Sequence, residues 1–142
     1  SQFQLLLYER LQQHSDAQIA AITAKAIKET SYHVRWSSEW VIRLGDGTKE
    51  SHERMLNALN NIWNYTGEIF VPADFEKEEF NPESLKQLWE EKVTHIFDEA
   101  TLPVPGNVYM HTGGKQGRHT EHLGYILAEL QYMQRAYPGS TW

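Results

Sequence analysis

Glu29 and His33 are the residues whose types and spacing most suggest chemistry. They are four apart in a long helical pattern, so their side chains meet on the face that also carries the apolar residues. One interpretation is the remnant of a di-metal carboxylate site, which in helix bundles uses Glu-x-x-His. Thr30 stands three residues before His33, and a hydroxyl is a poor ligand for iron or manganese. We therefore predict no metal site and favour a structural Glu29–His33 hydrogen bond in a core.

A second cluster, His119, Glu121 and His122, is expected at the start of the last helix. Two histidines three apart beside a carboxylate could bind zinc, but the sequence places no third ligand. Polar capping and contacts across an interface are the favoured alternatives. The other histidines are scattered and are interpreted as ordinary polar residues: His14, His52, His95 and His111.

The segment 113–118, Gly-Gly-Lys-Gln-Gly-Arg, has the glycines of a phosphate-binding loop. It fails the Walker pattern because Tyr109 stands at the first glycine position and Gln116 follows Lys115 where Ser or Thr is required. A basic loop before a helix remains, in which Lys115 and Arg118 could contact an anion such as a phosphate, or a partner's carboxylate. No Ser/His/Asp grouping or dinucleotide fingerprint accompanies the loop, and we predict no catalytic residue.

Helices must position these residues. Asp16 can N-cap a long helix that ends at 45–47, Gly-Asp-Gly. One side of this helix is marked by residues that recur at steps of three and four: Ile19, Ile22, Ala26, Glu29, His33, Trp36, Trp40 and Leu44. Thr48 can cap a second helix that Pro72 stops, and Asn81 followed by proline opens a third. The acidic stretch 74–79 between them is expected to be a solvated connection.

The two ends of the chain are also predicted to be helical. An apolar spacing places the first residues inside a helix: Phe3, Leu6, Leu7 and Leu11. The last helix is expected to start near Thr120, to stop at 137–139 and to bury Leu123, Ile126, Leu127, Leu130 and Met133.

The connection 103–119, including the loop 106–119, lacks periodicity and has a length typical of functional loops. Four tryptophans are expected in the core: Trp36, Trp40, Trp63 and Trp89. We predict an all-α fold of about five helices in a single helical domain, 1–142.

Composition narrows the function classes. Lys and Arg number 13 against 19 Asp and Glu, a formal net charge of −6, so we predict neither a nucleic-acid nor a membrane partner. The absence of cysteine excludes disulfides, thiolate zinc sites, iron–sulfur clusters and cysteine nucleophiles. No apolar run approaches the ~18 residues of a membrane-spanning helix, and the cytoplasm is the expected compartment.

Two stretches resemble one family. They are 21–29, Ala-Ile-Thr-Ala-Lys-Ala-Ile-Lys-Glu, continuing to 32–35, Tyr-His-Val-Arg, and 112–115, Thr-Gly-Gly-Lys, continuing to 119–124, His-Thr-Glu-His-Leu-Gly. Supporting matches are 43–48, Arg-Leu-Gly-Asp-Gly-Thr, and 128–135, Ala-Glu-Leu-Gln-Tyr-Met-Gln-Arg. The chain is similar to the non-catalytic structural subunits of bacterial phenylacetyl-CoA oxygenases, in the ferritin-like superfamily.

The resemblance implies a partial ferritin-like helical bundle, the C-terminal part of a longer subunit. It implies a scaffold in a multicomponent monooxygenase that epoxidises the ring of phenylacetyl-CoA during aerobic phenylacetate breakdown. The catalytic oxygenase subunit would be the partner and would hold the di-iron centre, leaving this chain without a cofactor. Two alternatives stay open, a di-metal carboxylate enzyme and a CoA-binding helical protein. With part of the bundle missing, a face such as that of Leu5, Leu6 and Leu7 would lie exposed, and we predict self-association.

Overall fold

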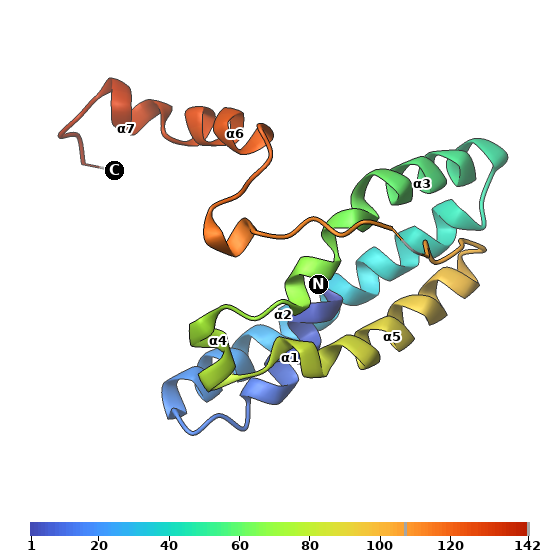
Figure 1. Cartoon of the computed structure of the whole chain (residues 1–142), viewed down its shortest axis with the longest axis horizontal. Coiled ribbons are helices and arrows are strands. Elements are labelled where there is room, and N and C mark those ends of the chain that lie inside the picture. The colour runs from blue at the N-terminus through green and yellow to red at the C-terminus, as the bar shows by residue number, and fades with distance from the viewer. Residues whose placement is uncertain (107, 142) are drawn as a thin grey trace. The chain divides into compact units, whose positions relative to one another are not determined.

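The computed structural model describes residues 1–106 and 108–141, apart from the side chains of Glu78 and Glu79. Regular structure in this part of the chain is helical, with no strand, which confirms the all-α prediction. Five of its α-helices have seven residues or more. The α-helices are α1 (Gln2–Leu11), α2 (Ala17–Gly45), α3 (Lys49–Ile62), α4 (Asp74–Glu79), α5 (Lys86–Glu99), α6 (His122–Leu130) and α7 (Tyr132–Ala136) (Figure 1). Short 3-10 helices are η1 (Trp63–Tyr65), η2 (Gly67–Phe70), η3 (Pro82–Leu85) and η4 (Gly114–Gln116).

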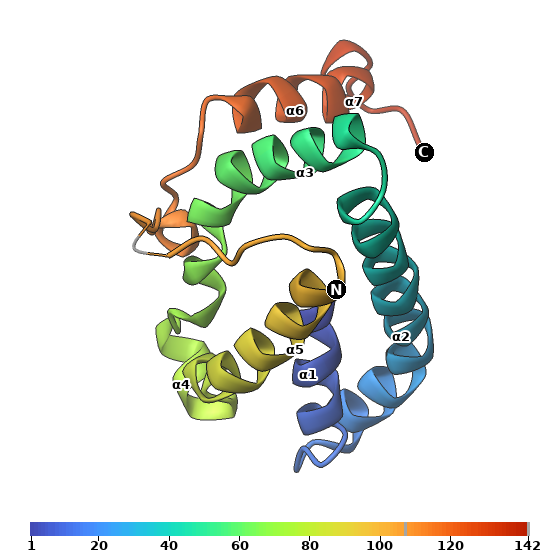
Figure 2. The same cartoon turned by 90° about the vertical axis from the view of Figure 1, so that its right-hand side faces the viewer.

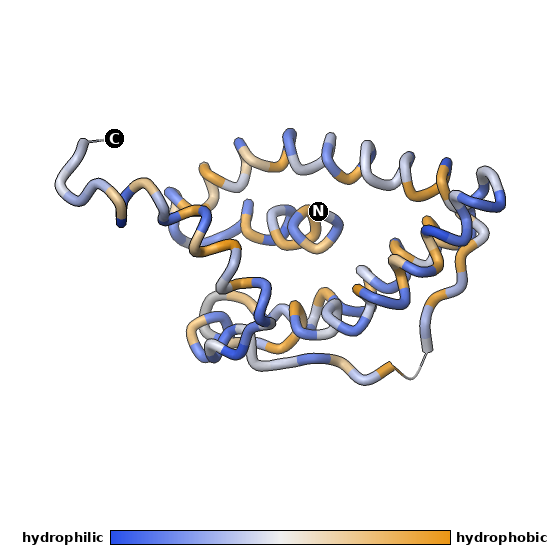
Figure 3. Tube along the Cα trace, turned by 90° about the horizontal axis from the view of Figure 1, so that it is seen from above, coloured by the Kyte–Doolittle hydropathy of each residue, from blue (hydrophilic) through white to orange (hydrophobic). Residues whose placement is uncertain are grey.

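The chain divides into two compact units, Ser1–His111 and Thr112–Trp142. The single domain expected over 1–142 stays a prediction, because units defined by compactness need not fold separately. Hydrophobic and hydrophilic residues alternate at short intervals along the helices, as amphipathic helices require (Figure 3). None of the described helices is long and apolar enough to cross a membrane.

An aromatic core holds the first unit together, with α1 packed against α2 and α5 (Figure 2). Trp89 lies at its centre, with ring centroids 5.8 Å from Trp63 and 5.2 Å from Phe70. Trp63 and Trp89 are buried, as the sequence predicts. Leu6 is also buried in this core, and Leu5 and Leu7 are half-buried. The expectation that these three leucines form an exposed face is therefore wrong, because α1 buries Leu6 in the aromatic core and packs Leu7 against it.

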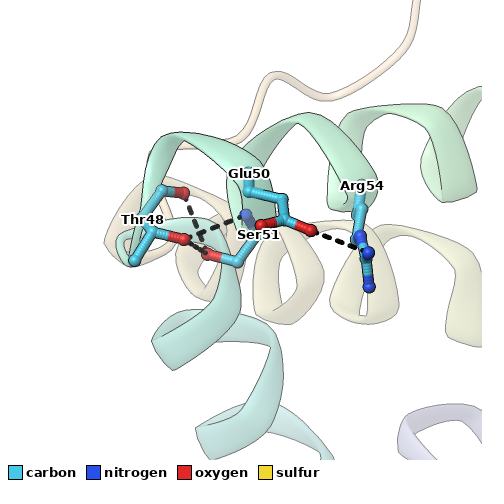
Figure 4. Close-up of polar contacts among 4 residues, drawn as sticks. All are labelled: Thr48, Glu50, Ser51 and Arg54. Atoms are coloured by element: carbon cyan, nitrogen blue, oxygen red, sulfur yellow. Dashed lines mark hydrogen bonds and ion pairs between the residues drawn. The ribbon is translucent and has the colours of Figure 1, made fainter.

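Capping residues set the helix boundaries where the sequence predicts them. The Asp16 carboxylate accepts hydrogen bonds from the backbone N–H groups of Gln18, at 2.7 Å, and Ile19, at 3.3 Å. At the start of α3 the Thr48 hydroxyl accepts from the Ser51 N–H at 3.2 Å, and the Ser51 hydroxyl donates to the Thr48 carbonyl at 2.9 Å (Figure 4). These contacts satisfy N–H groups that the helix itself leaves unpaired.

The second predicted helix is shorter than expected, since α3 ends at Ile62 and gives way to η1 and η2. The Thr66 hydroxyl donates to the Trp63 carbonyl at 2.8 Å, and the Asn64 carbonyl accepts from the His111 N–H at 2.8 Å. Hydrogen bonds from outside the helical ladder thus occupy the carbonyls that an α-helix would need to continue.

The acidic stretch 74–79, expected to be a solvated connection, forms the short helix α4, and Asp74, Phe75 and Lys77 in it are exposed. The Glu76 carboxylate accepts from the Ala73 N–H at 2.6 Å, which fixes the first turn. Asn81 behaves as predicted, because its side-chain oxygen accepts from the Glu83 N–H at 3.1 Å. The chain then enters η3 before α5.

The second unit contains η4, α6 and α7. The preceding connection is irregular as predicted, and its residue 107 lies outside the described residues. Leu123 is half-buried, but Ile126, Leu127, Leu130 and Met133 are exposed, so the predicted burial of this face is wrong. Two helices as short as α6 and α7 enclose too little space for a core of their own.

Candidate functional site

The Glu29–His33 pair lies on α2, where the two side chains meet at 3.8 Å between Glu29 Oε1 and His33 Nε2. Their side chains are 77% and 52% exposed, respectively. The prediction that the pair faces a core is therefore wrong. The buried side of α2 carries Thr23 and Thr30 instead. Thr30 follows Glu29 directly, so the buried side is turned by about 100° around the helix axis from Glu29.

Burial of the threonines has a local cause. The Thr23 hydroxyl donates to the Ile19 carbonyl at 3.0 Å, and the Thr30 hydroxyl donates to the Ala26 carbonyl at 3.1 Å. A hydroxyl paired within its own helix enters an interior without losing a hydrogen bond. The sequence carries a signal for this face, the seven-residue spacing of Thr23, Thr30 and the half-buried Ser37.

These residues do not fit a di-metal centre. Such a centre takes carboxylates and histidines from several facing helices, whereas Glu29 and His33 come from one. Within residues 1–106 and 108–141, leaving aside the side chains of Glu78 and Glu79, no group of three or more His, Asp or Glu side chains is placed to hold a metal. The glutamate position of a Glu-x-x-His motif ending at His33 is taken by Thr30, which is buried and whose hydroxyl donates to the Ala26 carbonyl.

An exposed stripe follows α2 through residues that the sequence assigns to the core: Ile22, Glu29, His33, Trp36, Trp40 and Leu44, with the half-buried Ala26 among them. Trp36 and Trp40 are 55% and 44% exposed, so their predicted burial is wrong. Their rings meet edge to face with centroids 6.3 Å apart. The Arg43 guanidinium lies 5.8 Å from the centroid of the Trp40 ring, a cation–π contact.

The glycine loop of the second unit is a closed turn. The Gly113 carbonyl accepts from the N–H groups of Gln116, at 3.0 Å, and Arg118, at 2.8 Å, and the Gly114 carbonyl accepts from the Gly117 N–H at 3.1 Å. Gly113 has φ +105° and Gly117 has φ +86°, which only glycine adopts readily. The turn thus uses three N–H groups that a phosphate cradle would need.

Side chains at this turn and at the start of α6 are exposed: Lys115, Arg118, His119, Glu121 and His122. Glu121 occupies the N-cap position without a side-chain hydrogen bond to the helix, so capping by that carboxylate is not what holds α6. The predicted roles of these residues in partner or anion contact stay predictions.

The first unit also contains an apolar cavity of about 540 Å³ that sequence patterns did not reveal. Its walls come from the first residues of the chain and from α2, α3 and α5, helices that surround the N-terminus (Figure 2). They include Phe3, Val41, Trp63, Val93 and Phe97, and no charged side chain. The cavity suits an apolar group and supplies no acid, base or metal ligand.

Comparison with known proteins agrees with the resemblance seen in the sequence. Residues 1–142 match the family described as phenylacetic acid catabolic protein. The chain is 46% identical over 142 residues to one subunit of the 1,2-phenylacetyl-CoA epoxidase of Escherichia coli (strain K12), a match covering 96% of this chain and 57% of that protein. The chain thus spans less than two thirds of the length of this relative. Because the family match covers every residue, the chain belongs to the phenylacetic acid catabolic protein family.

Proposed function

We propose that the chain forms part of a non-catalytic scaffold subunit in a multicomponent monooxygenase that epoxidises phenylacetyl-CoA during aerobic phenylacetate degradation. The identity of 46% to a protein named as a subunit of such an epoxidase supports the pathway and the assembly. The scaffold role rests on one observation, the placement of Glu29 and His33 on an exposed face while Thr30 takes the interior position.

The partner in this proposal is the catalytic oxygenase subunit, which would hold the di-iron centre and carry out the epoxidation. This chain would contribute a helical surface of a ferritin-like bundle and no cofactor, and would act in the cytoplasm. The two alternatives receive less support. A di-metal enzyme would need further carboxylates facing Glu29, and CoA-phosphate binding by Lys115 and Arg118 would lack the loop N–H groups already bonded within the turn.

Metal content and co-purification test the proposal together. The chain purified alone is expected to contain iron far below one equivalent by elemental analysis. Co-expressed with a tagged catalytic subunit, it should co-purify, and a His33→Ala variant should leave the iron content and epoxidation rate of the complex unchanged. Iron near one equivalent per chain in the isolated protein, or loss of iron from the complex on His33→Ala, would contradict the scaffold role.

A further inference from the structure

We draw no further inference here: the strongest candidate, the apolar cavity of the first unit between the first residues of the chain and α2, α3 and α5, offers no charged side chain that would select a ligand, and nothing in the structure shows what fills it.

Discussion

At the scale of single residues, hydrogen bonding decides which polar side chains enter the first unit. Thr23 and Thr30 complete their hydrogen bonds within α2 and are buried, whereas the Glu29 carboxylate meets His33 at 3.8 Å and is exposed. An ionised carboxylate cannot be satisfied by one such contact in an interior. The Glu29–His33 contact therefore contributes little to stability.

Replacing Glu29 should show this directly. Glu29→Ala should change the free energy of unfolding by no more than about 0.5 kcal/mol in urea denaturation, since exposed ion pairs contribute little. The control moves a carboxylate one position along the helix. Thr30→Glu should destabilise by about 3 kcal/mol, because it places the charge on the buried side of α2. A loss above about 1 kcal/mol for Glu29→Ala would mean that the pair has a structural role.

Gly45 is required by a close approach between α2 and the end of α5. A Cβ at Gly45 would lie 2.4 Å from the carbonyl oxygen of Ala100, a backbone atom that cannot rotate away. Gly45→Ala should therefore lower the free energy of unfolding by about 1 to 3 kcal/mol in urea denaturation. Gly124→Ala is the control, because a Cβ there would meet nothing within 4 Å beyond the adjacent residues and the backbone of its own helix. It should be neutral or stabilise α6 by up to about 1 kcal/mol, since alanine is the better helix former. Equal effects of the two substitutions would contradict the steric account.

At the scale of the elements, the residues at which helices begin could be predicted better than the side of each helix that is buried. Asp16 and Thr48 act on N–H groups two or three residues away, so local sequence was enough to place the starts of α2 and α3. Asn81 caps the 3-10 helix η3 instead, and α5 begins four residues later than predicted, at Lys86. The end of α3 depends on His111, which is distant in sequence, and was therefore placed too late. The buried side of α2 was misassigned because apolar residues occur on two sides of that helix. Spacing alone could not show which side would meet α1 and α5.

The buried core and the exposed stripe of α2 can be compared by replacing one tryptophan in each with alanine. Trp63→Ala removes a buried ring from the aromatic core and should destabilise by about 3 to 5 kcal/mol. Trp36→Ala removes an exposed ring and should change the free energy of unfolding by less than about 1 kcal/mol. Urea denaturation of the two variants at the same protein concentration makes the comparison. Similar losses for the two variants would show that the α2 stripe is buried in the monomer.

At the scale of the whole molecule, the candidate sites depend on tertiary structure to different degrees. The closed turn at Gly113 follows from glycines close in sequence, and the sequence marked that loop as unusual. The apolar cavity brings together residues as distant as Phe3 and Phe97, so no local pattern could indicate it. The hydrophobic residues after Thr112 are mostly exposed, so their spacing could not show that this segment forms a unit of its own.

Limited proteolysis should follow this division. Among the described residues of the second unit none is buried, and only Gly113, Gly114 and Leu123 are half-buried. Segments with so few buried contacts open at low free energy, and trypsin cleaves the opened state. Mass spectrometry of a brief digestion should therefore detect cleavage after Lys115 and Arg118 first, while exposed lysines within α2, such as Lys25, resist because the helix holds their backbone. In denaturing urea this order of cleavage should disappear, because the helix no longer protects Lys25. Initial cleavage at Lys25 in the native protein would show that α2 opens more easily than the second unit, and that the buried contacts of α2 do not hold it closed.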